Sequence, residues 1–107
     1  MKRCIVGLRD PDQATPGPAG KDAPTVWFAS MASLAAVLSD DNRALLRVIH
    51  SAKPKSLTEL AALTGRKVPN LSRTVKTMAG YGLLELQRNS HDLQPIALAT
   101  EFLVVLD

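Results

Sequence analysis

The alternation of apolar and polar positions over residues 56–84 predicts two helices joined by a tight turn. Ser56 is followed three residues later by Glu59, which is the spacing of a capping box and predicts the start of the first helix. Gly65 is expected to end that helix, and Pro69 suits the first turn of the next one, where its missing N–H costs nothing. In this second helix, the residues that form an apolar stripe at helical spacing are Val68, Leu71, Val75 and Met78.

The opposite face of the second helix is polar and carries no acidic residue. At about 100° per residue, the residues that share this face are Pro69, Ser72, Arg73, Lys76, Thr77 and Gly80. Over the longer segment 60–84 the sequence has no Asp or Glu, while its basic residues are Arg66, Lys67, Arg73 and Lys76. A positive surface without acidic residues favours contact with phosphates, because neutralised phosphates release condensed counterions. The alternative is a solvated basic helix face, but the position on the second helix of this motif favours DNA.

Upstream of this unit the sequence predicts two more helices and one short strand. Ser30 or Ser33 is expected to cap the first of these helices, and a second helix is predicted over residues 42–50. Residues 3–8 (RCIVGL) predict a short strand. Residues 9–24 hold four of the seven prolines and two glycines, so they predict a linker. The expected organisation is therefore a strand and linker over residues 1–24, followed by one domain over residues 25–107.

Downstream of the two helices the sequence predicts a β-hairpin and a further strand. The hairpin strands are expected over residues 83–88 and 93–98, with a turn between them. Pro95 suits an edge strand, because it cannot donate a ladder hydrogen bond. Residues 102–106 (FLVVL) form a continuous apolar run, which is typical of a strand covered on both faces. Such a strand predicts either an interface between molecules or packing on the first two helices.

Length, charge and cysteine content limit the class of protein. A chain of 107 residues has room for one domain with a modest core, and a net charge of +3 makes it mildly basic. Cys4 is the only cysteine, so an intrachain disulfide is excluded and a reducing cytoplasm is compatible. No apolar segment approaches the length of about 20 residues that spans a bilayer. We therefore expect a cytoplasmic protein that does not enter the membrane.

Catalytic and cofactor chemistry finds no support in the sequence. The letters Ser90-His91-Asp92 occur in a predicted turn, where consecutive residues do not converge on one nucleophile. Two histidines without cysteine or carboxylate partners at metal-ligand spacing predict no metal site. We expect that the protein is not an enzyme and that it needs no cofactor.

The helix-turn-helix segment resembles that of MarR-like winged-helix regulators. The residues that carry the resemblance are Leu60, Ala61, Gly65, Leu71, Ser72, Arg73, Val75, Met78, Gly82 and Leu83. Residues 26–50 and the strand-rich tail resemble a narrower group of small prokaryotic, antitoxin-like transcriptional regulators, so that the resemblance covers residues 25–107. Thr64, Arg66 and Thr74 depart from the pattern. The resemblance implies an α+β, mainly α fold: a winged helix-turn-helix with a C-terminal β-hairpin wing, to which this chain adds a terminal strand.

Together, the resemblance and the basic face predict a sequence-specific regulator that binds double-stranded DNA. The helix over residues 69–79 is expected in the major groove. The residues expected to contact base edges or phosphates from it are Asn70, Ser72, Arg73, Lys76 and Thr77. The residues expected to contact the DNA backbone are Ser56, Arg66 and Lys67 beside this helix and Arg88 on the wing. One such unit makes few contacts, which favours a homodimer on a two-fold site.

Several alternatives and extensions accompany this prediction. The dimer is expected to be a repressor that controls its own operon, and the resemblance suggests a toxin-like protein partner. A different function is a winged-helix module for protein–protein interaction without DNA binding, which the small net charge and the FLVVL run favour. An RNA-binding role is disfavoured, because the few aromatic residues are scattered and give no stacking platform.

Overall fold

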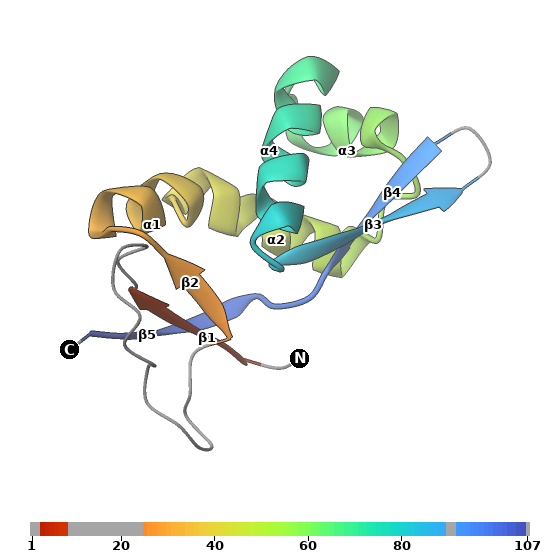
Figure 1. The fold of residues 1–107 in the computed structure, drawn as a ribbon. Helices are drawn as coiled ribbons and strands as arrows, with labels where there is room; N and C mark the ends of the chain where they lie inside the picture. The colour runs from red at the N-terminus through yellow and green to blue at the C-terminus, as the bar shows by residue number, and fades with distance from the viewer. Residues whose placement is uncertain (1–2, 9–24, 90–91, 107) are drawn as a thin grey trace.

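The structure is a computed structural model that describes residues 3–8, 25–89 and 92–106. In chain order, its elements are β1 (Arg3–Leu8), β2 (Val26–Phe28), α1 (Met31–Val37), α2 (Asp40–Ala52), α3 (Leu57–Thr64), α4 (Val68–Gly80), β3 (Leu84–Asn89), β4 (Asp92–Ala97) and β5 (Glu101–Val105) (Figure 1). The predicted linker at 9–24 and the residues Ser90 and His91 of the predicted turn lie outside the described residues.

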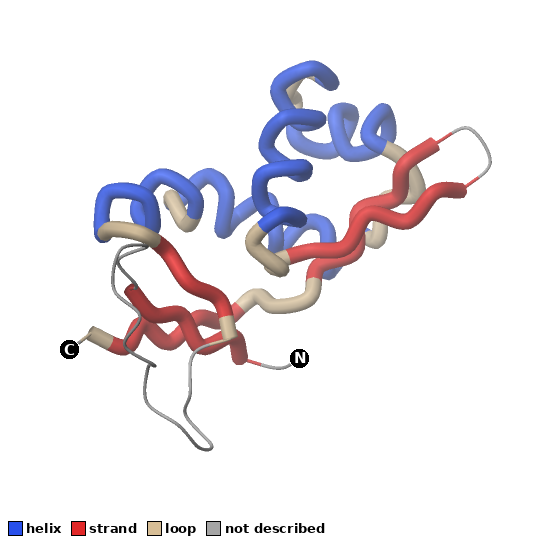
Figure 2. Tube along the Cα trace, in the orientation of Figure 1, coloured by secondary structure: helices blue, strands red, loops and turns tan. Residues whose placement is uncertain are grey.

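The predicted winged-helix architecture is confirmed. The helices α3 and α4 form the helix-turn-helix, and β3 and β4 form the antiparallel hairpin of the wing, with Leu84 opposite Ala97 and Asn89 opposite Asp92. Figure 2 shows the helices grouped on one side of the molecule and the wing extending beside α3. The predicted strand at residues 3–8 is also present. None of the described helices has both the length and the apolar character needed to cross a membrane.

Local hydrogen bonds explain where the helices of the motif begin and end. Ser56 Oγ accepts a hydrogen bond from the backbone N–H of Glu59 at 3.0 Å, as the capping spacing predicts. The Glu59 carboxylate reaches the N–H of Lys55 at 3.4 Å. Gly65 ends α3 with φ of 75°, a left-handed conformation that glycine adopts without a steric penalty. The N–H of Gly65 donates to the carbonyl of Ala61 at 2.8 Å and so closes the last turn of α3.

The N-terminal strand lies in the middle of a three-stranded parallel sheet. The strand order is β2-β1-β5, and Val6 of β1 is paired with Val26 of β2 and Val104 of β5. Parallel pairing joins segments that lie far apart in the sequence, since β1 and β5 come from opposite ends of the chain. Because Val6 is completely buried, β1 is an integral part of the core.

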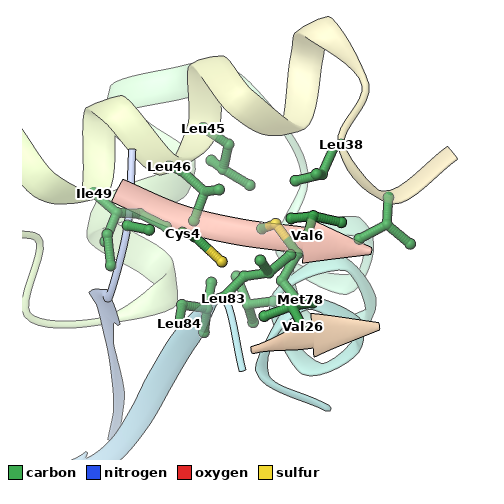
Figure 3. Packing of buried hydrophobic residues seen from close by; sticks show 14 of the residues in the cluster. Cys4, Val6, Val26, Leu38, Leu45, Leu46, Ile49, Met78, Leu83 and Leu84 are labelled. Atoms are coloured by element: carbon green, nitrogen blue, oxygen red, sulfur yellow. The ribbon is translucent and has the colours of Figure 1, made fainter. Parts of the chain in front are cut away.

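One aliphatic core holds the sheet, the helices and the wing together. The residues with no exposed surface are Val6, Leu46, Leu60, Leu71, Val75, Met78 and Leu83. Figure 3 shows Cys4 and Val6 of β1 among side chains of α2 and of the segment that ends α4 and begins β3. Phe28 stacks on Tyr81, with ring centroids 4.4 Å apart, and this contact joins β2 to the end of α4. The position of α4 is therefore fixed by its buried stripe and by packing at its C-terminal end.

Of the two alternatives for the FLVVL segment, packing on the first two helices is seen in part, and an interface between molecules stays a prediction. The segment forms β5, which is an outer strand of its sheet. Phe102 packs against the core, but Val104 is 37% exposed and Leu106 is 56% exposed. The physical reason is that α1 and α2 cover only part of this strand, since a chain of this length has too little material to cover it fully.

Candidate nucleic-acid interface

Helix α4 separates an apolar face from a polar face, as its sequence predicts. Leu71, Val75 and Met78 are completely buried. The prediction for Val68 is wrong, since this first residue of α4 lies at the start of the helix and is 38% exposed. On the opposite side, the exposed residues are Pro69, Arg73, Lys76, Thr77 and Gly80, while Ser72 is half-buried beside them. Because the buried stripe fixes the rotation of the helix in the core, this polar face is held toward solvent.

Arg66 lies in the turn before α4 and is bonded to the helix itself. Its Nε and Nη2 atoms donate to Asn70 Oδ1 at 3.1 and 2.8 Å, and Nη2 also donates to Thr74 Oγ1 at 3.4 Å. The backbone N–H of Arg66 donates to Thr64 Oγ1 at 3.3 Å. These bonds hold the guanidinium group against the first two turns of α4. A guanidinium carries five N–H donors, so some of them are left for a further acceptor such as phosphate.

This network changes what Asn70 can do. Bidentate recognition of adenine needs both the oxygen and the nitrogen of an asparagine side chain. Because Asn70 Oδ1 accepts from Arg66, an adenine contact of this kind requires those bonds to break. The remaining amide N–H groups suit a phosphate oxygen without any rearrangement. In this geometry Asn70 positions Arg66.

The other predicted contact residues lie on three separate elements. Ser56 is half-buried at the start of α3, and its oxygen is already used as the helix cap. Lys67 is the exposed N-cap residue of α4 and makes no side-chain cap bond. Arg88 is exposed on β3, opposite Leu93 and four residues beyond Leu84, which is about 13 Å along a strand. The structure thus brings Arg66 and Asn70 together directly, whereas Arg88 stands apart on the wing.

The basic residues of this surface lack acidic neighbours at bonding distance. Within the part of the chain that the structure describes, the one ion pair joins Arg43 to Asp40 on α2. The carboxylates nearest in sequence are Glu59 before the acid-free segment and Glu85 after it. The charge of Arg66, Lys67, Arg73 and Lys76 is therefore not neutralised by ion pairing within the described residues.

Two supporting side chains were missed by sequence reasoning. Thr74 departs from the apolar pattern of the motif, and the structure shows that its hydroxyl accepts from Arg66. The spacing of Arg66, Asn70 and Thr74 at four-residue steps is a signal that indicates one side of a helix. Asn42 donates through Nδ2 to the carbonyl of Val37 at 3.0 Å and so ties α1 to α2 beside α4. No pattern in the sequence indicates that second contact.

The fold is similar to that of a solved bacterial protein. It matches the crystal structure of the predicted DNA-binding transcriptional regulator from E. coli with a TM-score of 0.53 and 22% sequence identity. The match covers 64% of this chain and 73% of that chain, and at this identity it establishes the fold. No curated protein sequence matches this chain.

A family model matches more than half of this chain. The model of the HVO_A0114 family matches residues 37–104, which include α2, the helix-turn-helix, the wing and nearly all of β5. The MarR-like resemblance and its antitoxin-like subgroup stay predictions. Because the family model spans more than half of the sequence, the chain belongs to the HVO_A0114 family.

Proposed function

We propose that this protein is a DNA-binding transcriptional regulator that inserts α4 into the major groove of double-stranded DNA. The observation that carries the proposal is the exposed face of α4, where Arg73 and Lys76 stand beside hydroxyl groups and no acidic residue. Helix α4 has 13 residues and is therefore about 20 Å long. A helix of these dimensions fits the major groove, which is about 12 Å wide.

Each side chain of this surface has a role that follows from its position. Arg73 lies at the centre of the exposed face and suits bidentate pairing with guanine, while Ser72, Lys76 and Thr77 beside it suit base edges or phosphates. Arg66 and Lys67 stand at the start of the helix and suit the phosphate backbone, as does the helix start at Ser56. Arg88 contacts phosphate from the wing.

The similar fold of the E. coli protein supports this proposal, since that protein is described as a predicted DNA-binding transcriptional regulator. We extend the proposal to a homodimer that represses its own operon in the cytoplasm, because two copies double the few contacts that one α4 makes. A toxin-like protein partner is the further extension that the MarR-like, antitoxin-like resemblance suggests. The proposal assigns no catalytic role to the chain.

Fluorescence anisotropy on two duplexes tests the proposal. One duplex carries the DNA upstream of the protein's own gene, and the other carries the same bases in shuffled order. We expect tighter binding to the native duplex. The four basic residues of the α4 region in each of two copies predict an affinity that falls by about a thousandfold or more between about 50 and 200 mM salt.

Equal affinity for both duplexes would show that the protein binds DNA through its positive charge without sequence preference. That result would contradict sequence-specific regulation. Absence of binding to either duplex at low salt would overturn the proposal and favour the alternative, a winged-helix module that contacts another protein.

A further inference from the structure

A cavity of about 560 Å³ lies where three helices meet. Its lining comes from the first half of α2, from the C-terminal end of α3, and from the turn before α4 together with the first residues of that helix. This volume is within the range of about 300–1,000 Å³ in which proteins bind small molecules. The lining includes Arg66, one of the residues assigned above to DNA phosphates.

One part of the cavity wall is aliphatic. Ala44, Leu45 and Val48 lie on one side of α2, since they are spaced by one helical turn, and Leu63 of α3 completes this part of the lining. Leu63 is 51% exposed, so a large apolar side chain is in contact with water in the single chain. Covering it with an aliphatic group would remove apolar surface from water, which is favourable. This wall therefore suits an aliphatic side chain of a ligand.

Two groups of opposite charge also line the cavity. Asp41 is exposed at the start of α2, and within the described residues its carboxylate makes no hydrogen bond or ion pair. Arg66 uses Nε and Nη2 on Asn70 and Thr74, whereas its Nη1 makes no bond to the described residues. Asp41 and Arg66 line the same cavity without forming an ion pair with each other. A ligand can therefore engage a negative and a positive group separately.

We propose that this cavity binds a free α-amino acid with an aliphatic side chain. Its ammonium group pairs with Asp41, its carboxylate pairs with Arg66, and its side chain covers Leu63. The charges favour a zwitterion, because a ligand with only a carboxylate or only an amine leaves one charge of the cavity unpaired beside a like charge. The bonds to Asn70 and Thr74 hold the Arg66 side chain in place before the ligand arrives, which lowers the ordering cost of binding.

Occupation of the cavity would regulate DNA binding, and this part of the proposal rests on the proposed function. The N–H groups of Arg66 Nη1 are the donors left for a phosphate, and the carboxylate of a bound amino acid would occupy them. Two ligands that compete for one group lower each other's affinity by the same factor. We therefore expect the amino acid to release the protein from DNA.

An NMR titration of the isotope-labelled protein with leucine, in the absence of DNA, tests the site. We expect saturable amide shift changes at Ala44, Val48, Leu63 and Arg66, and none in β1. So small a ligand is expected to bind with a dissociation constant in the micromolar to millimolar range, and the titration therefore extends to about 10 mM. Absence of saturable changes, or changes centred elsewhere, would overturn the proposal.

Three related compounds test the individual parts of the recognition. Isocaproate is leucine without the amine, isoamylamine is leucine without the carboxylate, and glycine is a zwitterion without the side chain. Each is expected to bind at least about fivefold more weakly than leucine, because each loses a charge-assisted hydrogen bond or the apolar contact. Equal affinity for leucine and any one of the three would contradict recognition of an aliphatic zwitterion.

The Asp41→Asn variant tests the ammonium contact. It removes the negative charge and keeps the shape of the side chain, and we expect its affinity for leucine to fall by at least about fivefold. The matched control is Asp40→Asn, which makes the same change at the neighbouring residue. Asp40 is not part of the lining and pairs with Arg43, so this control should bind leucine as the unmodified chain does. Equal losses in the two variants, or no loss in Asp41→Asn, would count against the proposed site.

Fluorescence anisotropy on the native upstream duplex, with and without leucine, tests the regulation. We expect saturating leucine to lower the affinity for DNA by about fivefold or more. Glycine at the same concentration is the control and should have no effect. The Asp41→Asn variant should bind DNA at least as tightly as the unmodified chain, since it loses a negative charge, and its affinity should respond much less to leucine.

Failure of the site is distinguishable from failure of the proposed function. If leucine shifts the lining residues but no duplex is bound, the site is supported and the proposed function is wrong. If the duplex is bound but leucine gives no saturable shifts, the site is wrong and the proposed function is unaffected. If leucine binds and leaves the affinity for DNA unchanged, competition for Arg66 is contradicted.

Discussion

Replacing Arg73 and Lys76 together by alanine is expected to lower the affinity for the native upstream duplex by at least about thirtyfold for each copy bound, because each lost base or phosphate contact costs about 1–3 kcal/mol. Both residues are exposed on α4 and make no ion pair within the described residues, so their removal leaves the core intact. The free energy of unfolding is expected to change by less than about 0.5 kcal/mol per residue. Fluorescence anisotropy and urea denaturation measure the two effects.

A matched double variant separates local contact from total charge. Arg3→Ala combined with Lys53→Ala removes the same two charges from β1 and from the end of α2, where both side chains are exposed. We expect this control to bind with nearly unchanged affinity. The slope of log affinity against log salt should fall by about two per copy only for the α4 variant. Equal losses in the two variants would mean that overall charge, and not the α4 face, determines binding.

Replacing Phe28 by alanine is expected to destabilise the fold by about 3–5 kcal/mol, the range for removing a buried aromatic ring. Phe28 is only 1% exposed, and its ring stacks on Tyr81, which follows the last residue of α4. A domain of this size has a total stability of roughly 5–15 kcal/mol. The variant should therefore unfold at a much lower urea concentration than the unmodified chain.

The Tyr81→Phe variant is the control for this substitution. It keeps the stacked ring and should change the stability by less than about 0.5 kcal/mol. The DNA affinity of Phe28→Ala is to be measured well below the unfolding transition of this variant. We expect it to fall only to the extent that loss of the Phe28–Tyr81 contact lets the end of α4 move. A loss of less than about 1 kcal/mol on truncating Phe28 would show that the β2–α4 contact does not hold the helix.

The parts of the fold that the sequence predicts correctly are those specified by neighbouring residues. Ser56, Glu59 and Gly65 determine the ends of α3 through hydrogen bonds that span at most four residues. The apolar stripe of α4 determines which face is buried, so the exposed face that contains Arg73 and Lys76 follows directly. The wing is likewise local, since its paired strands β3 and β4 are close neighbours in the sequence.

The parallel sheet could not be predicted in the same way. The apolar run of β1 indicates a strand, but nothing in it shows that β2 and β5 lie on its two sides. Parallel pairing depends on contacts between distant segments, which have no local pattern. For the same reason, FLVVL shows that β5 is apolar but does not show that Val104 is left exposed.

Hydrogen bonds between side chains of the candidate site are a second feature that could not be predicted from the sequence. The sequence predicts DNA contacts for Arg66 and Asn70, and it gives no reason to expect that these two residues bond to each other. In the sequence, Thr74 is only a polar residue that interrupts the apolar pattern. In the structure, its hydroxyl accepts a hydrogen bond from Arg66. The assignment of each side chain to bases, phosphates or support therefore needs the structure.

The most direct test of the central claim is an NMR titration of the isotope-labelled protein, whose mass is 11.5 kDa, with the native upstream duplex. We expect the largest amide shift changes in the turn at Arg66 and Lys67 and along the exposed face of α4, with smaller changes near Arg88 on the wing. The outward residues of β1 should shift little. Large changes confined to the sheet or to α1, with α4 unaffected, would contradict the account that α4 is the DNA-reading helix.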